Sequence, residues 1–144
     1  QIDRAIIDKK GKLTNEEFET IKTHTTAGEE MLIGLTGFED EPLVNYARQI
    51  CRYHHERYDG KGYPDGLKGD EIPIAAQVVS VCDVYDALIS ERPYKRAYTH
   101  DEAVKMIKNG ECGAFNPVIL ECFDECSDKF GEIIEREKKG EFGR

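Results

Sequence analysis

Four polar side chains occupy inward-facing positions in helical patterns, and their types suggest metal chemistry. His24 shares a helix face with Ile21, while His54 and His55 continue the apolar edge of a second helical pattern. Asp83 lies within the most hydrophobic stretch of the chain, on the stripe of small apolar residues. A buried carboxylate is costly without a positive partner. We therefore expect these four side chains to face the interior together.

A mixed set of imidazoles and a carboxylate favours a first-row transition metal over Mg²⁺ or Ca²⁺, which prefer oxygen ligands alone. Zinc, iron and manganese all remain open. The alternative for each histidine taken singly is a core residue with satisfied hydrogen bonds, and for Asp83 a local cap or ion pair. The set of four on three helices favours metal binding.

Two helices must carry the histidines. Thr14 and Glu17 form a capping box that predicts a helix start, and this helix should stop near residues 34–37. Its expected apolar side includes Phe18, Ile21, Gly28, Met31, Leu32 and Leu35. Pro42 suits the first turn of a second helix, which should end around Arg57.

A loop and a central helix follow. Residues 58–73 are rich in Gly, Asp and Pro, which predicts an ordered loop without regular structure, a feature that usually has a function. The loop either brings backbone close to a ligand or a partner protein, or packs on the domain as a structural element. Residues 73–90 are nearly all apolar, which predicts a central helix buried on most sides.

The remaining segments complete an all-α reading. Thr99 and Glu102 form a second capping box, and Gly110 should close that helix. Asn116 and Pro117 start a last apolar helix. We expect residues 1–13 to form a loop and residues from about 128 to 144 to form a charged tail.

Composition restricts the class of protein. The 144 residues carry a formal net charge of -9, which argues against a nucleic-acid polymer as partner because phosphate binding needs a basic face. No apolar run is long enough to span a bilayer and no signal peptide is evident, so we expect a cytoplasmic protein. The five cysteines lie in apolar patterns and are expected to be small buried residues; a metal role for Cys122 and Cys126 is disfavoured.

Two long runs resemble a known family. Residues 54–103, HHERYDGKGYPDGLKGDEIPIAAQVVSVCDVYDALISERPYKRAYTHDEA, closely resemble the HD-GYP signature, including the Gly-Tyr-Pro triplet at 62–64. Residues 10–32, KGKLTNEEFETIKTHTTAGEEML, look like the family segment that follows its His-Asp motif. The resemblance covers about residues 3–123, and it implies an all-α helical bundle of the HD-domain type with five to six helices. We expect a single partial domain over 1–144.

The resemblance implies roles for particular positions. The family's metal ligands match His24, His54, His55 and Asp83, which would hold two or three divalent ions, with iron or manganese favoured and zinc possible. Asp86 matches a carboxylate that supports structure. The groups that hold the phosphates of the substrate match Arg92 and Lys95, and Tyr63 of the triplet is also expected at the substrate. Arg96 would add to this local positive charge.

The sequence departs from the family at its amino-terminal side. Family members carry a His-Asp motif with a nearby Lys just before the segment that opens this chain, so the resemblance implies that this motif and the preceding helices are absent. We therefore identify no certain catalytic residue. The adjacent pair His100-Asp101 follows the Thr99 cap, where a solvated helix start is expected.

The resemblance implies a metal-dependent phosphodiesterase that hydrolyses cyclic diguanylate to a linear dinucleotide or GMP, with this chain inactive by itself. Open apolar faces would favour a homodimer, and the GYP loop could contact a protein partner. One alternative is a non-catalytic interaction module of the HD-GYP type. Another is an HD-superfamily phosphohydrolase that acts on a different nucleotide.

Overall fold

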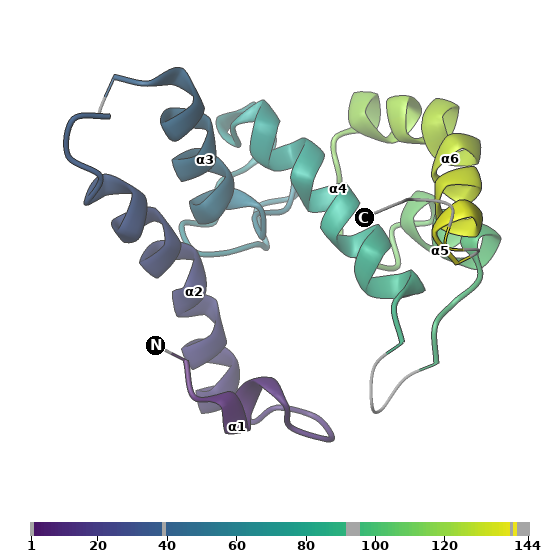
Figure 1. The fold of residues 1–144 in the computed structure, drawn as a ribbon, viewed down its shortest axis with the longest axis horizontal. Helices are drawn as coiled ribbons and strands as arrows, with labels where there is room; N and C mark the ends of the chain where they lie inside the picture. Colours follow the sequence, from purple (N-terminus) through teal and green to yellow (C-terminus); the bar gives the residue numbers. More distant parts are fainter. Residues whose placement is uncertain (1, 39, 92–95, 139, 141–144) are drawn as a thin grey trace.

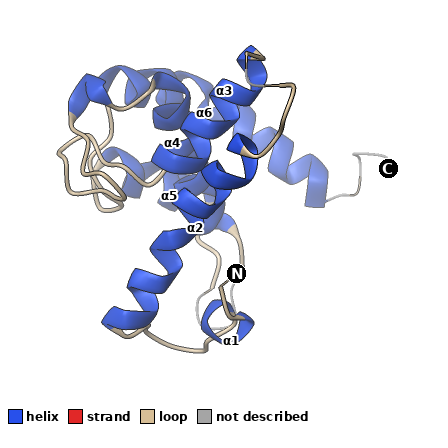
Figure 2. Cartoon of the chain, turned by 90° about the vertical axis from the view of Figure 1, so that its left-hand side faces the viewer, coloured by secondary structure: helices blue, strands red, loops and turns tan. Residues whose placement is uncertain are grey.

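The computed structural model describes residues 2–38, 40–91, 96–138 and 140, and these ranges form helices joined by loops. Figure 2 shows helices and loops and no strand in these ranges. The all-α fold predicted from the sequence is confirmed. The elements are α1 (Arg4–Ile7), α2 (Asn15–Ile33), α3 (Pro42–Tyr53), the short 3₁₀ helix η1 (Gly69–Glu71), α4 (Ile74–Ile89), α5 (His100–Lys108) and α6 (Pro117–Lys138).

The helix α4 crosses the middle of the molecule and separates two groups of helices (Figure 1). On one side α2 and α3 form a hairpin, and α3 packs against α4. On the other side α5 and α6 both pack against α4 and against each other. The long loop between α3 and α4 therefore lies where the two groups meet, next to the end of α3.

The hydrophobic core lies between α4, α5 and α6. It is built from one face of each helix together with an aromatic residue of the preceding loop: Val81, Tyr85, Leu88, Ala103, Ile107, Phe115 and Phe123. The Tyr85 ring stands edge-on to Phe123 with centroids 5.7 Å apart. Ring pairs of this kind stabilise a core beyond the area that they bury. The core fixes α4, against which the α2–α3 hairpin is then placed.

Both predicted capping boxes are present. The Glu17 backbone N–H donates to Thr14 Oγ1 at 3.2 Å, and the Thr14 N–H donates to Glu17 Oε2 at 2.6 Å. Thr99 and Glu102 repeat this exchange at 3.2 and 2.8 Å. These contacts satisfy backbone donors that the first helical turn leaves free. The starts of α2 and α5 are therefore fixed locally by sequence.

Three boundaries differ from the prediction. A short helix, α1, stands within the expected loop 1–13, and its first turn is capped by Asp3, which accepts from Ala5 N at 2.9 Å. The helix α3 ends at Tyr53, earlier than expected. The helix α6 continues to Lys138, into the segment predicted as a tail, because Phe130 and Ile134 extend its apolar stripe onto the core.

Burial also differs from the prediction on two helices. The helix α4 is not buried on most sides, since Ile74 is 59% and Val78 44% exposed. A groove of about 170 Å³ between α4 and α6 is lined by Val78, Val81, Cys82, Ile119, Cys122, Phe123, Cys126 and Phe130. Its three cysteines are exposed, and Cys51 and Cys112 are half-buried, so the expectation of buried cysteines is wrong. The core covers only one face of α4 in the described residues.

The expected apolar side of α2 is also largely exposed. Phe18, Met31 and Leu35 are all exposed, and Thr25 is the buried residue of this helix. The buried face of α2 is narrower than predicted because its main packing partners are α1 and α3. Across the described ranges, none of the helices combines the length and the apolar character that a membrane crossing requires.

Candidate metal centre

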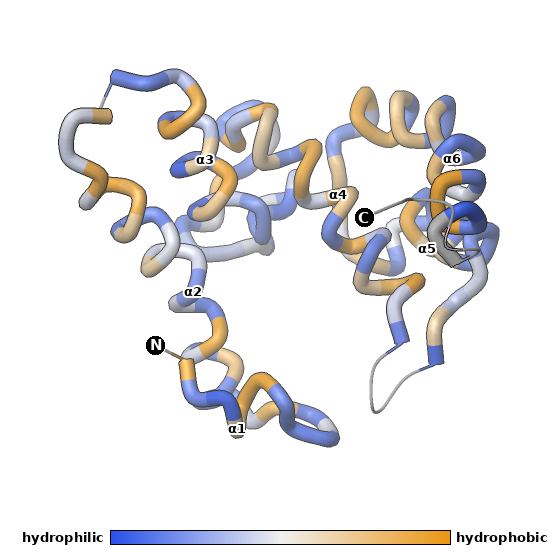
Figure 3. Tube along the Cα trace, viewed as in Figure 1, coloured by the Kyte–Doolittle hydropathy of each residue, from blue (hydrophilic) through white to orange (hydrophobic). Residues whose placement is uncertain are grey.

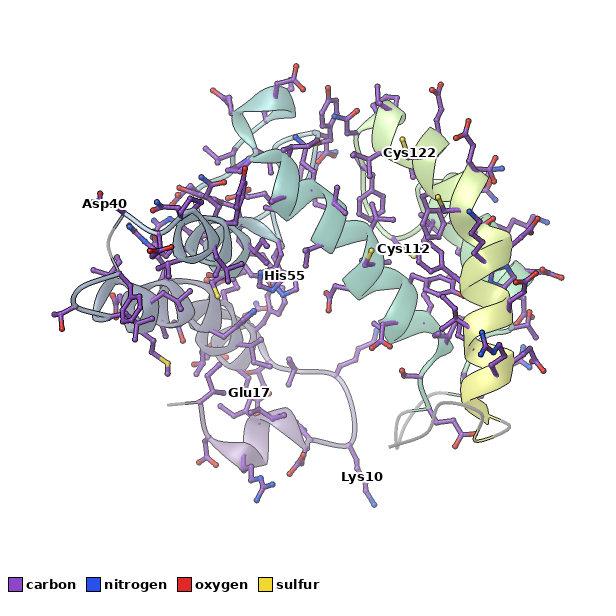
Figure 4. The ribbon with its side chains drawn as sticks, turned by 45° about the horizontal axis from the view of Figure 1, so that its top comes forward. Lys10, Glu17, Asp40, His55, Cys112 and Cys122 are labelled. Carbon is purple, nitrogen blue, oxygen red and sulfur yellow. The ribbon has the colours of Figure 1, made fainter. Side chains whose placement is uncertain are left out.

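Three histidines from two neighbouring helices converge beside α4. His24 comes from the middle of α2, His54 caps the end of α3, and His55 follows it. One ligand nitrogen from each ring can be chosen so that all three lie within 4.8 Å of one another. Figure 4 shows His55 pointing into the space between the α2–α3 hairpin and α4. The structure thus brings together three of the four predicted metal ligands.

Backbone contacts fix the tautomers of two of these rings. His24 Nδ1 lies 2.7 Å from the Ile21 carbonyl oxygen, and His54 Nδ1 lies 2.8 Å from that of Ile50. A carbonyl only accepts, so each Nδ1 must carry the proton and donate it. In the neutral rings each Nε2 then presents a bare lone pair. Hydrogen bonds of this kind orient histidines that bind metals through the other nitrogen.

The two lone pairs point at each other. His24 Nε2 and His54 Nε2 are 3.3 Å apart, and with both Nδ1 protonated the neutral rings have no proton to place between them. Two such acceptors in contact repel unless a cation or an added proton lies between them. Nitrogens bound to one metal at ~2.1 Å in tetrahedral geometry lie about 3.4 Å apart. The spacing therefore fits two ligands of one ion.

The third ring, His55, is held neutral and stacked. Burial lowers the pKa of His55 to about 3, with further lowering from His54 and His24 when those rings are protonated and from the Arg57 charge. A neutral imidazole is the form that binds a metal. The ring of Tyr63 stacks on His55 with centroids 4.8 Å apart. Burial also raises the pKa of Tyr63 to about 12, so its phenol keeps its proton at neutral pH.

The fourth predicted ligand, Asp83, does not join the cluster. It is exposed on α4 and lies outside the group of convergent ligand atoms, so the expectation of a buried carboxylate is wrong. Its charge still acts on the centre's surroundings: burial lowers the pKa of Arg57, which Asp83 partly opposes, and burial raises the pKa of Tyr63, to which Asp83 adds. The helix α4 is apolar on several faces, and that pattern could not show which face meets the hairpin.

A residue that the sequence reasoning missed, Glu56, anchors the loop beside the histidines. Glu56 is only 2% exposed, and its Oε1 accepts from the backbone N–H groups of Asp65 at 2.7 Å and Gly66 at 3.0 Å. Hydrogen bonds to a charged acceptor are stronger than neutral ones. The only signal in the sequence is an acid directly before a Gly-rich loop whose backbone donors need acceptors.

Close backbone packing sets the position of the same loop. A Cβ added to Gly62 would meet Arg57 N at 2.3 Å and Glu56 Cα at 2.4 Å, so only glycine fits. This contact places the neighbouring Tyr63 against His55; the peptide bond between Tyr63 and Pro64 is cis. The loop thus packs on the domain, which supports the structural reading of the two alternatives.

Charged side chains reinforce this arrangement. Arg52 makes two parallel hydrogen bonds to the Asp65 carboxylate, both 2.9 Å long, and donates to Glu29 Oε2 at 2.6 Å. One guanidinium thereby joins α2, α3 and the loop. The Lys22 ammonium lies 5.5 Å from the centre of the Tyr63 ring. Lys22 is a cation near the centre that the sequence reasoning did not identify, and it is paired with Glu19.

The predicted phosphate-binding residues cannot be placed relative to the histidines. Arg92 and Lys95 lie outside the described residues. Arg96 is exposed and pairs with Glu102 at 3.5 Å. His100 differs from the expected solvated residue, because its Nδ1 lies 2.7 Å from the Tyr85 hydroxyl and its ring packs near Gly131.

Comparison with known proteins finds a family and several similar proteins. The HD domain family matches residues 4–117. A Vibrio cholerae protein named Probable cyclic di-GMP phosphodiesterase is 43% identical over 91% of this chain and 30% of its own length. The Cyclic di-GMP phosphodiesterase of Thermotoga maritima is 39% identical over 94% of this chain and 36% of its own length. The 3'3'-cGAMP-specific phosphodiesterase 3 of Vibrio cholerae is 36% identical over 85% of this chain and 25% of its own length.

The chain spans between a quarter and about a third of the length of these relatives. The family match covers most of the chain, and the Gly-Tyr-Pro triplet at 62–64 sits in the ordered loop beside the histidines. The chain therefore belongs to the HD domain family and carries the HD-GYP signature.

Proposed function

We propose that the protein of which this chain forms part is a metal-dependent phosphodiesterase that hydrolyses cyclic diguanylate. The observation that supports a metal centre is the 3.3 Å distance between the Nε2 atoms of His24 and His54. In each of these rings Nδ1 donates to a backbone carbonyl. The names of the relatives support the substrate, since two of them are named for cyclic di-GMP.

In this proposal His24, His54 and His55 hold divalent ions, whereas Asp83, the predicted carboxylate ligand, lies outside their cluster. Iron or manganese is the favoured metal, with zinc possible, and two or three ions are expected. A bound cation supplies activation of water and neutralisation of phosphate charge. The chain's own part is to present neutral imidazoles, to hold Tyr63 against the centre, and to place Arg92 and Lys95 at the phosphates.

A second substrate is favoured by one specific observation. A relative with 36% identity is named for 3'3'-cGAMP, a cyclic dinucleotide that differs from cyclic diguanylate in one base. The two ligands share the phosphates that a metal centre recognises. Base contacts must then distinguish them, and Tyr63 is the aromatic side chain at the centre that could stack on a base.

The test is a binding experiment on the whole chain. Equilibrium dialysis would measure binding of cyclic diguanylate, 3'3'-cGAMP and the linear dinucleotide pGpG, each with and without Mn²⁺. We expect Mn²⁺ to strengthen binding of cyclic diguanylate, and His54→Asn to remove that increment. Binding of equal strength without Mn²⁺, or an increment that survives in His54→Asn, would refute the metal-centred reading. Preference for 3'3'-cGAMP would select the second substrate.

Three further expectations stay predictions. They are the inactivity of this chain by itself, a homodimer formed through open apolar faces, and a cytoplasmic location. A non-catalytic module that contacts a protein through the GYP loop is the remaining alternative, and it predicts no response to Mn²⁺. The dialysis experiment therefore separates that alternative from the enzyme.

A further inference from the structure

The turn of the α2–α3 hairpin exposes large apolar side chains. Leu43 is 78% and Met31 77% exposed, and the same stretch also exposes Ile33, Leu35, Phe38 and Tyr46. Single exposed apolar residues are ordinary on a protein surface. A group of this density within residues 31–46 is a feature of interaction sites. We call this stretch the hairpin tip.

The hairpin tip is also purely acidic. Residues 31–46 contain no Lys or Arg and three acids, Glu39, Asp40 and Glu41, and two further acids, Glu29 and Glu30, directly precede this stretch. Glu29 is paired with Arg52, whereas Glu30, Asp40 and Glu41 are exposed. Asp40 stands at the outer end of the hairpin in Figure 4. In Figure 3 the connection between α2 and α3 is hydrophilic in the stretch that leads into α3.

This charge decides between the possible occupants of the surface. A symmetric contact with a second copy would bring the same acidic patches together, because a twofold interface uses one surface twice. An anionic membrane would repel the tip for the same reason. A basic segment would be attracted and oriented. The spacing of Leu43 and Tyr46 places this pair on one side of α3.

We propose that the hairpin tip docks a basic amphipathic helix of a partner protein. The helix would set its apolar face on Met31 and Leu43 and its cations beside Asp40 and Glu41. Methionine suits such a surface because its unbranched side chain adapts to different shapes. The tip lies at the start of α3, roughly 16 Å along the helix axis from His54. A docked helix therefore leaves the histidine cluster accessible.

The probe is a synthetic helical peptide of Leu and Lys, with all Leu on one face, labelled for fluorescence anisotropy. We expect saturable binding to the chain and none for the twin peptide in which every Lys is Glu. Leu43→Ser and Glu41→Lys should each weaken binding at least ~10-fold, which corresponds to about 1.4 kcal/mol. Both positions are exposed, so neither change should disturb folding, as circular dichroism would verify.

Matched controls lie on α6. Val118 is 62% exposed and Glu121 is also exposed, so Val118→Ser and Glu121→Lys repeat the two changes away from the tip. Both should bind the peptide as the unchanged chain does. An equal loss in Glu121→Lys would show attraction by net charge alone, an equal loss in Val118→Ser would show that the apolar contact is not specific to the tip, and either would overturn the proposal. Dissociation of a dimer by Leu43→Ser in sedimentation, or binding of the tip to phosphatidylserine vesicles, would also overturn it.

Discussion

Replacing Gly62 by alanine adds one methyl group where the backbone leaves no room. The new Cβ would lie 2.3 Å from Arg57 N and 2.4 Å from Glu56 Cα. Non-bonded carbon atoms are in favourable contact at about 3.5–4.0 Å. The two backbone segments must therefore separate by more than about 1 Å. The loop that carries Tyr63 would move away from the end of α3.

The cost follows from what that movement breaks. Overpacking in a rigid site costs about 1–3 kcal/mol. The separation also lengthens the hydrogen bonds from Asp65 and Gly66 to Glu56 Oε1, and a bond to a charged group contributes about 1.5–3 kcal/mol. We expect Gly62→Ala to lower the free energy of unfolding by about 3 kcal/mol or more. At this chain length that corresponds to a loss of about 6–12 °C in melting temperature.

Urea unfolding followed by circular dichroism measures this change. The control is Gly34→Ala at the end of α2, where the added Cβ meets Met31 O at an ordinary 3.5 Å. We expect that variant to stay within about 0.5 kcal/mol of the unchanged chain. If Gly62→Ala were as stable as Gly34→Ala, the close packing of the loop would be refuted.

Three shorter predictions follow. Glu56→Ala should cost about 1.5–3 kcal/mol in urea unfolding because it removes the carboxylate that accepts from two loop N–H groups; an unchanged midpoint would contradict the anchor. Because burial lowers the pKa of His55 from 6.5 to about 3, the unfolded chain binds more protons between these values. The free energy of unfolding should then fall as pH falls through this window, by less than about 1.4 kcal/mol per pH unit since the ring reaches solvent. His55→Asn should reduce this slope, and an equal slope in the variant would contradict the prediction. The chain by itself should hydrolyse little cyclic diguanylate with Mn²⁺ present, and turnover close to that of a whole relative would contradict this.

Local signals made much of the fold predictable. The capping boxes at Thr14 and Thr99 act within three residues, so the sequence shows them directly. The convergence of His24 with His54 was predictable because each lies on the inward side of an amphipathic helix. These predictions needed only the helical period.

Other features depend on how distant segments meet. The role of Glu56 requires the loop to fold back on the end of α3, which no local pattern encodes. The exposure of Asp83 could not be predicted because an almost uniformly apolar α4 does not indicate which face packs. The extension of α6 was missed because Phe130 and Ile134 lie in residues 128–138, a stretch in which most residues are charged.

The metal centre is tested most directly by titrating the chain with Co²⁺ and recording its visible absorption, which reports nitrogen coordination. We predict saturable binding that His24→Gln and His54→Asn each weaken at least ~10-fold, since each removes a ligand. The control is His100→Gln, because His100 bonds to Tyr85 and stands outside the cluster. It should bind Co²⁺ as the unchanged chain does. No saturable binding, or an equal loss in His100→Gln, would contradict the assignment of these histidines to a metal centre.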